Sequence, residues 1–62
     1  MKTVDSDTIT TAQIEALKNE AGTAGDLDMV EVCQDALYCE GERQRSARQR
    51  CARVINDAAA QE

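Results

Sequence analysis

Apolar residues recur at helical spacing in three successive stretches of the chain, and no stretch shows the strict alternation of a strand. In the first stretch Ile14, Leu17 and Ala21 share one face, while charged and amide side chains occupy most of the other. Gly22 and Gly25 follow directly and are expected to end the helix. The pattern therefore predicts a first helix that ends before the second apolar stretch begins.

Local signals mark where this helix begins. Thr10 is followed three places later by Gln13, which is the spacing of a capping box, so we expect the helix to start near Thr11. Ile9 and Ile14 occupy the two positions of a hydrophobic staple, in which the residue before the cap packs against the first turn of the helix.

The second stretch predicts a helix from about Leu27 to Glu40. Asp26 suits the N-cap, and Asp28 places negative charge in the first turn, where the helix dipole favours it. At about 100° per residue the apolar side chains spread over more than half of the circumference. An arc this wide needs more cover than two short neighbours supply, so we expect self-association through Leu27, Met29, Val30, Val32, Cys33 and Leu37.

The third stretch predicts an amphipathic helix from about Glu42 to Ala60, after a helix-ending glycine at Gly41. Its expected seam is thin, because it consists mainly of small side chains, and comprises Ala47, Cys51, Val54, Ile55 and Ala58.

These elements predict an all-α fold, a three-helix mini-bundle in which a helical hairpin is joined by a third amphipathic helix. Residues 1–8 are polar and aperiodic, so we expect a frayed N-terminus, with residues 9–62 forming a single domain. The chain has 62 residues, no Phe, no Trp and a single Tyr38, so its core must be small. Dimerisation would complete such a core.

Charge is distributed unevenly along the chain. Residues 1–42 contain ten carboxylates and two lysines, a net charge of −8, whereas residues 43–62 carry +3. Asp28, Glu31 and Asp35 project from one face of the second helix, so a basic surface of another protein is one candidate partner. The alternative is contact with DNA or RNA through Arg43, Arg45, Arg48, Arg50 and Arg53. The chain has a net charge of −5, and no aromatic residue lies between the arginines to stack on bases. Both features favour binding to a protein over binding to nucleic acid.

The sequence lacks the motifs that mark the common catalytic and metal sites. It has no histidine, no Gly-rich phosphate loop and no nucleophile beside a base, so we expect neither an enzyme nor a cofactor. The three cysteines are spaced by six and twelve residues and match no usual zinc pattern. A bridge between Cys33 and Cys51 and two packed thiols both remain open. With no apolar leader or membrane span, we expect a soluble, cytoplasmic protein with no small-molecule substrate.

The segments ITTAQIEALKNEAGTAGDLDMVEVCQDAL and ARQRCARVINDAAAQ contain an Ile-Thr start, a Gln-Ile pair, an Ala-Gly-Asp turn, a central Cys and an Ala-rich tail. This pattern resembles that of short uncharacterised proteins that recur in plasmids, phages and related bacterial genomes. The resemblance covers roughly residues 8–61 and implies a bacterial, mobile-element context without an assigned activity. The sequence thus predicts a small acidic interaction module that binds its own copy or another protein, as adaptor or inhibitor.

Overall fold

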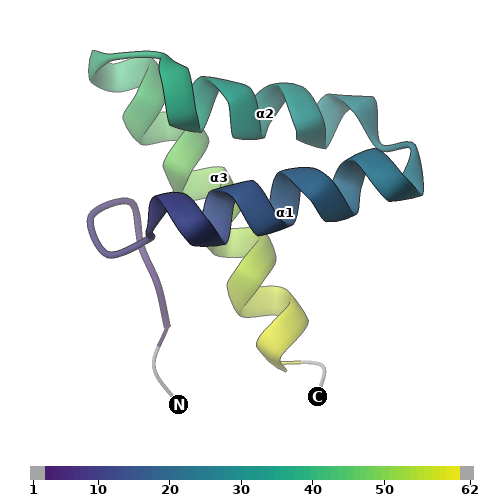
Figure 1. Cartoon of the computed structure of the whole chain (residues 1–62). Helices are drawn as coiled ribbons and strands as arrows, with labels where there is room; N and C mark the ends of the chain where they lie inside the picture. The colour runs from purple at the N-terminus through teal and green to yellow at the C-terminus, as the bar shows by residue number, and fades with distance from the viewer. Residues whose placement is uncertain (1–2, 61–62) are drawn as a thin grey trace.

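The computed structural model describes residues 3–60, and three helices account for most of them. They are α1 (Thr11–Ala24), α2 (Leu27–Tyr38) and α3 (Gly41–Ala60). Figure 1 shows α1 and α2 as an antiparallel hairpin, with α3 crossing behind both and its C-terminal turns extending past α1. The predicted all-α fold with three helices is confirmed, and the described residues contain no strand.

Helix α1 begins as predicted and ends at the second of the two glycines that were expected to stop it. The Thr10 side chain accepts a hydrogen bond from the Gln13 N–H, and the Gln13 side chain accepts one from the Thr10 N–H, so the capping box is confirmed. Gly22 does not end the helix. The stop is Gly25, whose φ of 77° is left-handed and whose N–H reaches the carbonyls of Ala21 and Gly22.

Helix α2 has the predicted cap, because the Asp26 carboxylate accepts from the N–H of Met29. It ends at Tyr38, two residues before the predicted end, and Cys39 already has extended backbone angles. Gly41, at φ 68°, is the first residue of α3. A left-handed residue at this point turns the chain sharply from α2 into the crossing helix.

The N-terminal segment differs from the frayed end that its polarity indicated; residues 1 and 2 lie outside the described residues. The Asp5 carboxylate accepts from the N–H groups of Asp7 and Thr8, which holds the pKa of Asp5 below its ordinary value of 3.8. The side-chain amide of Asn56, on α3, makes two hydrogen bonds to the backbone of Val4: it accepts from the Val4 N–H and donates to the Val4 carbonyl, each at 2.9 Å. The segment is therefore fastened across α3 by bonds to a distant residue, which local polarity could not reveal.

The core lies where α3 crosses the hairpin. It comprises Ile9, Ile14, Cys33, Ala36, Ala47, Cys51 and Ala52. The predicted seam of α3 is correct at Ala47 and Cys51 but wrong at Val54 and Ala58, which are exposed because the last turns of α3 run beyond the hairpin. Ala52 is buried instead, near Ile9 of the N-terminal segment. Within residues 3–60 no helix is both long and apolar enough to cross a membrane.

Candidate interaction surface

The most exposed large apolar side chains among the described residues lie on α2. Leu27 is 76% exposed and Tyr38 is 72% exposed. They are eleven residues apart, which is about three helical turns, so both project from the same side of the helix. Glu31 and Gln34 are also exposed and lie between them on that side. We call these four residues the outer face of α2.

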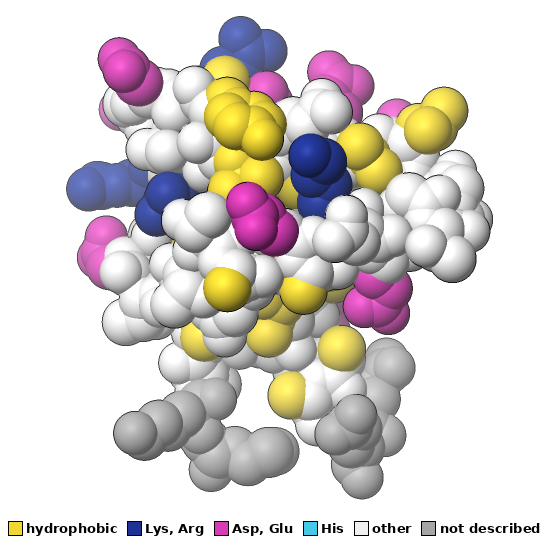
Figure 2. Space-filling view, viewed as in Figure 1, with side chains coloured by type: hydrophobic (Ala, Val, Ile, Leu, Met, Phe, Trp, Pro, Cys, Tyr) yellow, Lys and Arg dark blue, Asp and Glu magenta, His cyan; other side chains and the backbone are white. Residues whose placement is uncertain are grey.

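Tyr38 is partly held by the neighbouring helix. The ammonium nitrogen of Lys18, on α1, lies 5.9 Å from the centre of the Tyr38 ring, within range of a cation–π contact. Figure 2 shows the side of the molecule formed by α1 and α2, where apolar side chains reach the surface beside basic ones. A ring restrained by Lys18 loses less side-chain freedom when a partner covers it.

The predicted self-association residues separate into three groups in the structure. Cys33 is fully buried inside the chain, where no partner reaches it. Three others are partly buried and pack against the core, namely Met29, Val32 and Leu37. Leu27 is exposed and Val30 is half-buried. The hairpin and α3 thus cover more of the apolar arc than expected. Tyr38 was not among the expected contact residues, although its spacing of eleven from Leu27 places both on one side of the helix.

The acidic side chains of α2 face arginines of α3. The Nε of Arg43 lies 3.9 Å from a carboxylate oxygen of Asp35 in an ion pair that is largely exposed on the arginine side. Arg50 lines a hollow of about 350 Å³ together with Asp28, Glu31 and Asp35. The three predicted acidic residues therefore do share a surface, and that surface also contains positive charge.

The arginines of α3 have different surroundings. The Nε of Arg48 donates to the carbonyl of Ala36 at 3.1 Å, and the amide of Gln44 donates to the same oxygen. Arg45 lines a polar hollow of about 520 Å³ that also contains Asp7 and Glu42. Arg53 shares another hollow with Asp57. Arg43 and Arg50 lie beside the acidic residues of α2 described above, so carboxylates accompany the arginines around the helix instead of leaving one uniform basic face.

A second apolar surface lies between α1 and the C-terminal half of α3. The groove has a volume of about 320 Å³ and a mainly apolar lining, in which Ala16 and Leu17 face Val54, Ile55 and Ala58. Leu17 and Ile55 pack partly against the core, as expected, whereas Val54 and Ala58 are exposed because a helical wheel does not show where a neighbouring helix ends.

The cysteines are the remaining reactive groups, and all three are free thiols. Burial raises the pKa of Cys33, and burial beside the Cys33 thiol raises that of Cys51 to about 12. Partial burial, together with the carboxylate of Asp35 that its thiol contacts at 3.4 Å, raises the pKa of Cys39. No group of three potential metal ligands converges within residues 3–60. The thiols are thus held in their protonated form near neutral pH.

The chain matches no protein-family model, no curated protein and no solved structure. The resemblance to short plasmid and phage proteins therefore stays a prediction.

Proposed function

We propose that this protein is a helical interaction module whose first partner is a second copy of itself, bound through the outer face of α2. The observation that carries the proposal is the exposure of Leu27 and Tyr38 on one side of one helix. A partner that covered these two large side chains would remove their apolar surface from water, which favours association. Tyrosine in particular contributes strongly to protein interfaces, because its ring is rigid and large.

The order of residues on this face fits an antiparallel pairing of two α2 helices around a two-fold axis. In that pairing Leu27 of one copy meets Tyr38 of the other, and Glu31 meets Gln34. Every contact then joins a large apolar pair or a carboxylate and an amide. A parallel pairing would place Glu31 against Glu31 of the second copy, which like-charge repulsion disfavours.

The composition supports the same arrangement. A chain of 62 residues without Phe or Trp has few large side chains with which to build a core. Leaving Leu27 and Tyr38 in water forfeits the burial of two of them. A symmetric contact recovers this burial twice, since both copies contribute the same residues.

Sedimentation equilibrium of the intact protein at tens of micromolar tests the proposal. We expect a species of twice the 6.8 kDa chain mass. Leu27→Gln and Tyr38→Gln should each shift the population toward monomer. Each substitution is present in both copies, so it breaks both contacts between Leu27 and Tyr38, one at each end of the interface. Val54→Gln is the matched control, since Val54 is 38% exposed in the groove between α1 and α3.

Two results would contradict this assignment. A wild-type protein that sediments at 6.8 kDa over the whole concentration range excludes the dimer. If only Val54→Gln dissociates the dimer, the interface is the groove between α1 and α3 and not the outer face of α2. Nucleic-acid binding through the arginines is tested separately by a gel-shift titration at low salt, where we expect no complex because carboxylates surround Arg43, Arg45 and Arg50.

A further inference from the structure

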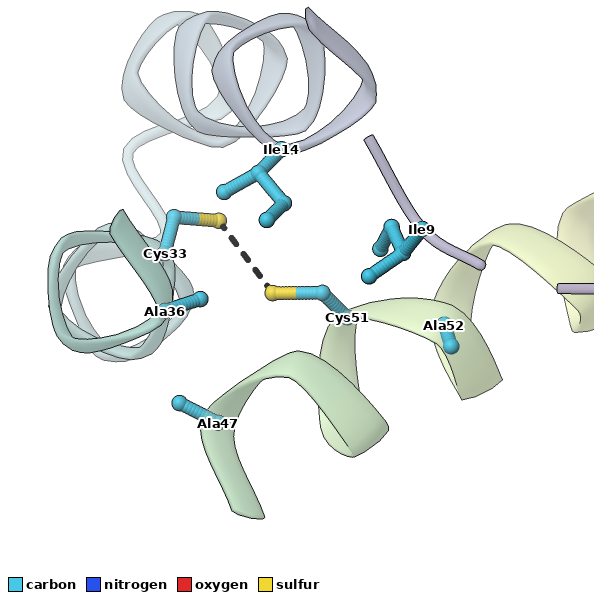
Figure 3. Close-up of a cluster of buried hydrophobic side chains, with 7 residues drawn as sticks. All are labelled: Ile9, Ile14, Cys33, Ala36, Ala47, Cys51 and Ala52. Atoms are coloured by element: carbon cyan, nitrogen blue, oxygen red, sulfur yellow. Dashed lines mark hydrogen bonds between the residues drawn. The ribbon is translucent and has the colours of Figure 1, made fainter. Parts of the chain in front are cut away.

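Two thiols from different helices face each other in the centre of the core. The sulfur atoms of Cys33 on α2 and Cys51 on α3 lie 3.9 Å apart, and both side chains are completely buried. Figure 3 shows the two thiols pointing toward one another where α2 and α3 approach, with Ile14 above them. Eighteen positions of sequence separate them, so the fold alone creates this proximity.

From this geometry we propose that Cys33 and Cys51 form an oxidation site, a dithiol that a small disulfide such as oxidised glutathione converts into a covalent link between α2 and α3. Cys33 and Cys51 are the two thiols that react with each other, because they lie on two packed helices with their sulfurs facing. Cys39, the third thiol, lies at the C-terminal end of α2 with its sulfur directed to the Asp35 carboxylate, and it takes no part.

The surroundings permit the small movement that bond formation needs. The sulfurs must approach from 3.9 Å to about 2 Å, which side-chain rotation and a slight shift of one helix supply. Ala36 and Ala47 are the neighbours on the two helices in Figure 3, and neither has atoms beyond Cβ to obstruct such a rotation. Larger side chains at these positions would hold the two helices farther apart.

The reaction is a pair of thiol–disulfide exchanges. Local opening exposes one thiol, which loses its proton to water, and its sulfur attacks oxidised glutathione and breaks that disulfide. One reduced glutathione leaves, and a mixed disulfide remains on the protein. The second cysteine, also deprotonated, attacks the protein sulfur of this mixed disulfide and releases the other glutathione. Two thiols are oxidised and one glutathione disulfide is reduced to two thiols.

Burial makes this reaction depend on opening of the fold. Neither thiol contacts water in the closed structure, and burial holds both in the protonated form, which is a poor nucleophile. The rate of oxidation should therefore follow the frequency of opening and rise several-fold in mild urea. Once formed, the bond is equally buried, so its reduction by dithiothreitol also requires opening of the fold.

The cross-link should stabilise the fold measurably. It closes a loop that includes the end of α2, the turn at Cys39 and Glu40, and the first half of α3. Loops of this length lower the entropy of the unfolded chain enough to raise the Tm of a small domain by about 10–20 °C.

The experiment incubates the full chain with oxidised glutathione, with and without mild urea, and follows intact mass. We expect a product lighter by two hydrogen atoms and a higher Tm that reduction with dithiothreitol reverses. Cys33 and Cys39 lie on one tryptic peptide, residues 19–43, so Cys39→Ser is needed to assign the bond. This variant should give the same product, whereas Cys33→Ala and Cys51→Ala should not.

Several results would overturn the proposal. One is a chain that keeps all its thiols, or only a glutathione adduct, even in urea. Another is a bond that Cys39→Ser abolishes. A third is an oxidised wild-type chain whose Tm is equal to or lower than that of the reduced one. The comparison of oxidised with reduced wild type uses no substitution, so it stands even where a cysteine variant folds poorly.

Discussion

Single residues of the same type differ in this protein because their surroundings differ. Cys33 and Cys51 are completely buried, while Cys39 is partly exposed beside a carboxylate. The pattern placed Cys51 in the apolar seam of the third helix, which its burial confirms, whereas Cys33 was expected at a contact between copies and lies inside the chain. The pattern could not indicate that the two sulfurs meet, because that contact depends on the angle and height at which α3 crosses α2.

Stability should fall at alkaline pH because of Cys51. Its folded-state pKa of about 12 is higher than the ordinary 9.0, so the folded chain holds the thiol proton more tightly than the unfolded chain. The resulting stabilisation is complete below pH 9 and is lost as the pH rises from 9 toward 12. Urea unfolding at pH 8 and pH 10.5 measures this loss. Cys51→Ala should be less stable at pH 8 and lose less on going to pH 10.5; parallel losses would contradict the assignment.

At the scale of elements, the end of α2 shows how one helix fastens to the next. The carbonyls of a last helical turn have no partners within the helix. The Ala36 carbonyl is one of these, and it receives side chains of α3, Arg48 at 3.1 Å and Gln44 at 3.3 Å. A positive charge at a helix C-terminus is also stabilised by the helix dipole. Arg48 thus joins two helices, a role that its position among five arginines did not reveal.

Arg48→Ala should lower the free energy of unfolding by about 1–2 kcal/mol, because a charged hydrogen bond to a carbonyl is lost. Arg43→Ala is the control: it removes the same charge, but its ion pair with Asp35 is largely exposed on the arginine side and should contribute less than about 0.5 kcal/mol. Chemical denaturation followed by circular dichroism measures both. Equal effects of the two substitutions would show that net charge matters and the contact does not.

At the scale of the whole molecule, the N-terminal segment completes the domain. It brings Ile9 into the core, and Val4 packs against that core while its backbone pairs with Asn56. Ser6 adds a bond from its N–H to the side chain of Gln49. A chain with so few large apolar residues gains cover for α3 from a segment without regular structure.

Asn56→Ala should therefore destabilise the protein by about 1 kcal/mol, since two hydrogen bonds to Val4 are lost. Asn19→Ala is the matched control, because Asn19 is exposed on α1. At that position the better helix propensity of alanine should raise the free energy of unfolding by about 0.5 kcal/mol. Thermal unfolding of both variants provides the comparison, and a stabilising effect of Asn56→Ala would mean that the segment does not hold α3.

The sequence by itself determined what depends on neighbours along the chain. The cap at Thr10, the cap at Asp26 and the helical spacing between them involve residues within one or two turns, so the helices and the fold class were predictable. Of the two glycines predicted to end the first helix, Gly25 does so and Gly22 does not, because glycine permits a helix end without requiring one; the left-handed residue is Gly25.

Only the tertiary structure decided which apolar positions are covered. A helical wheel gives the direction of Val54 and Ala58 but not the point at which α3 leaves the hairpin, so their exposure depends on where the helices cross. The same crossing buries Cys33, brings it to Cys51 and leaves Leu27 and Tyr38 in water. Burial depends on contacts between residues far apart in the chain, whereas periodicity records only the direction in which each side chain projects.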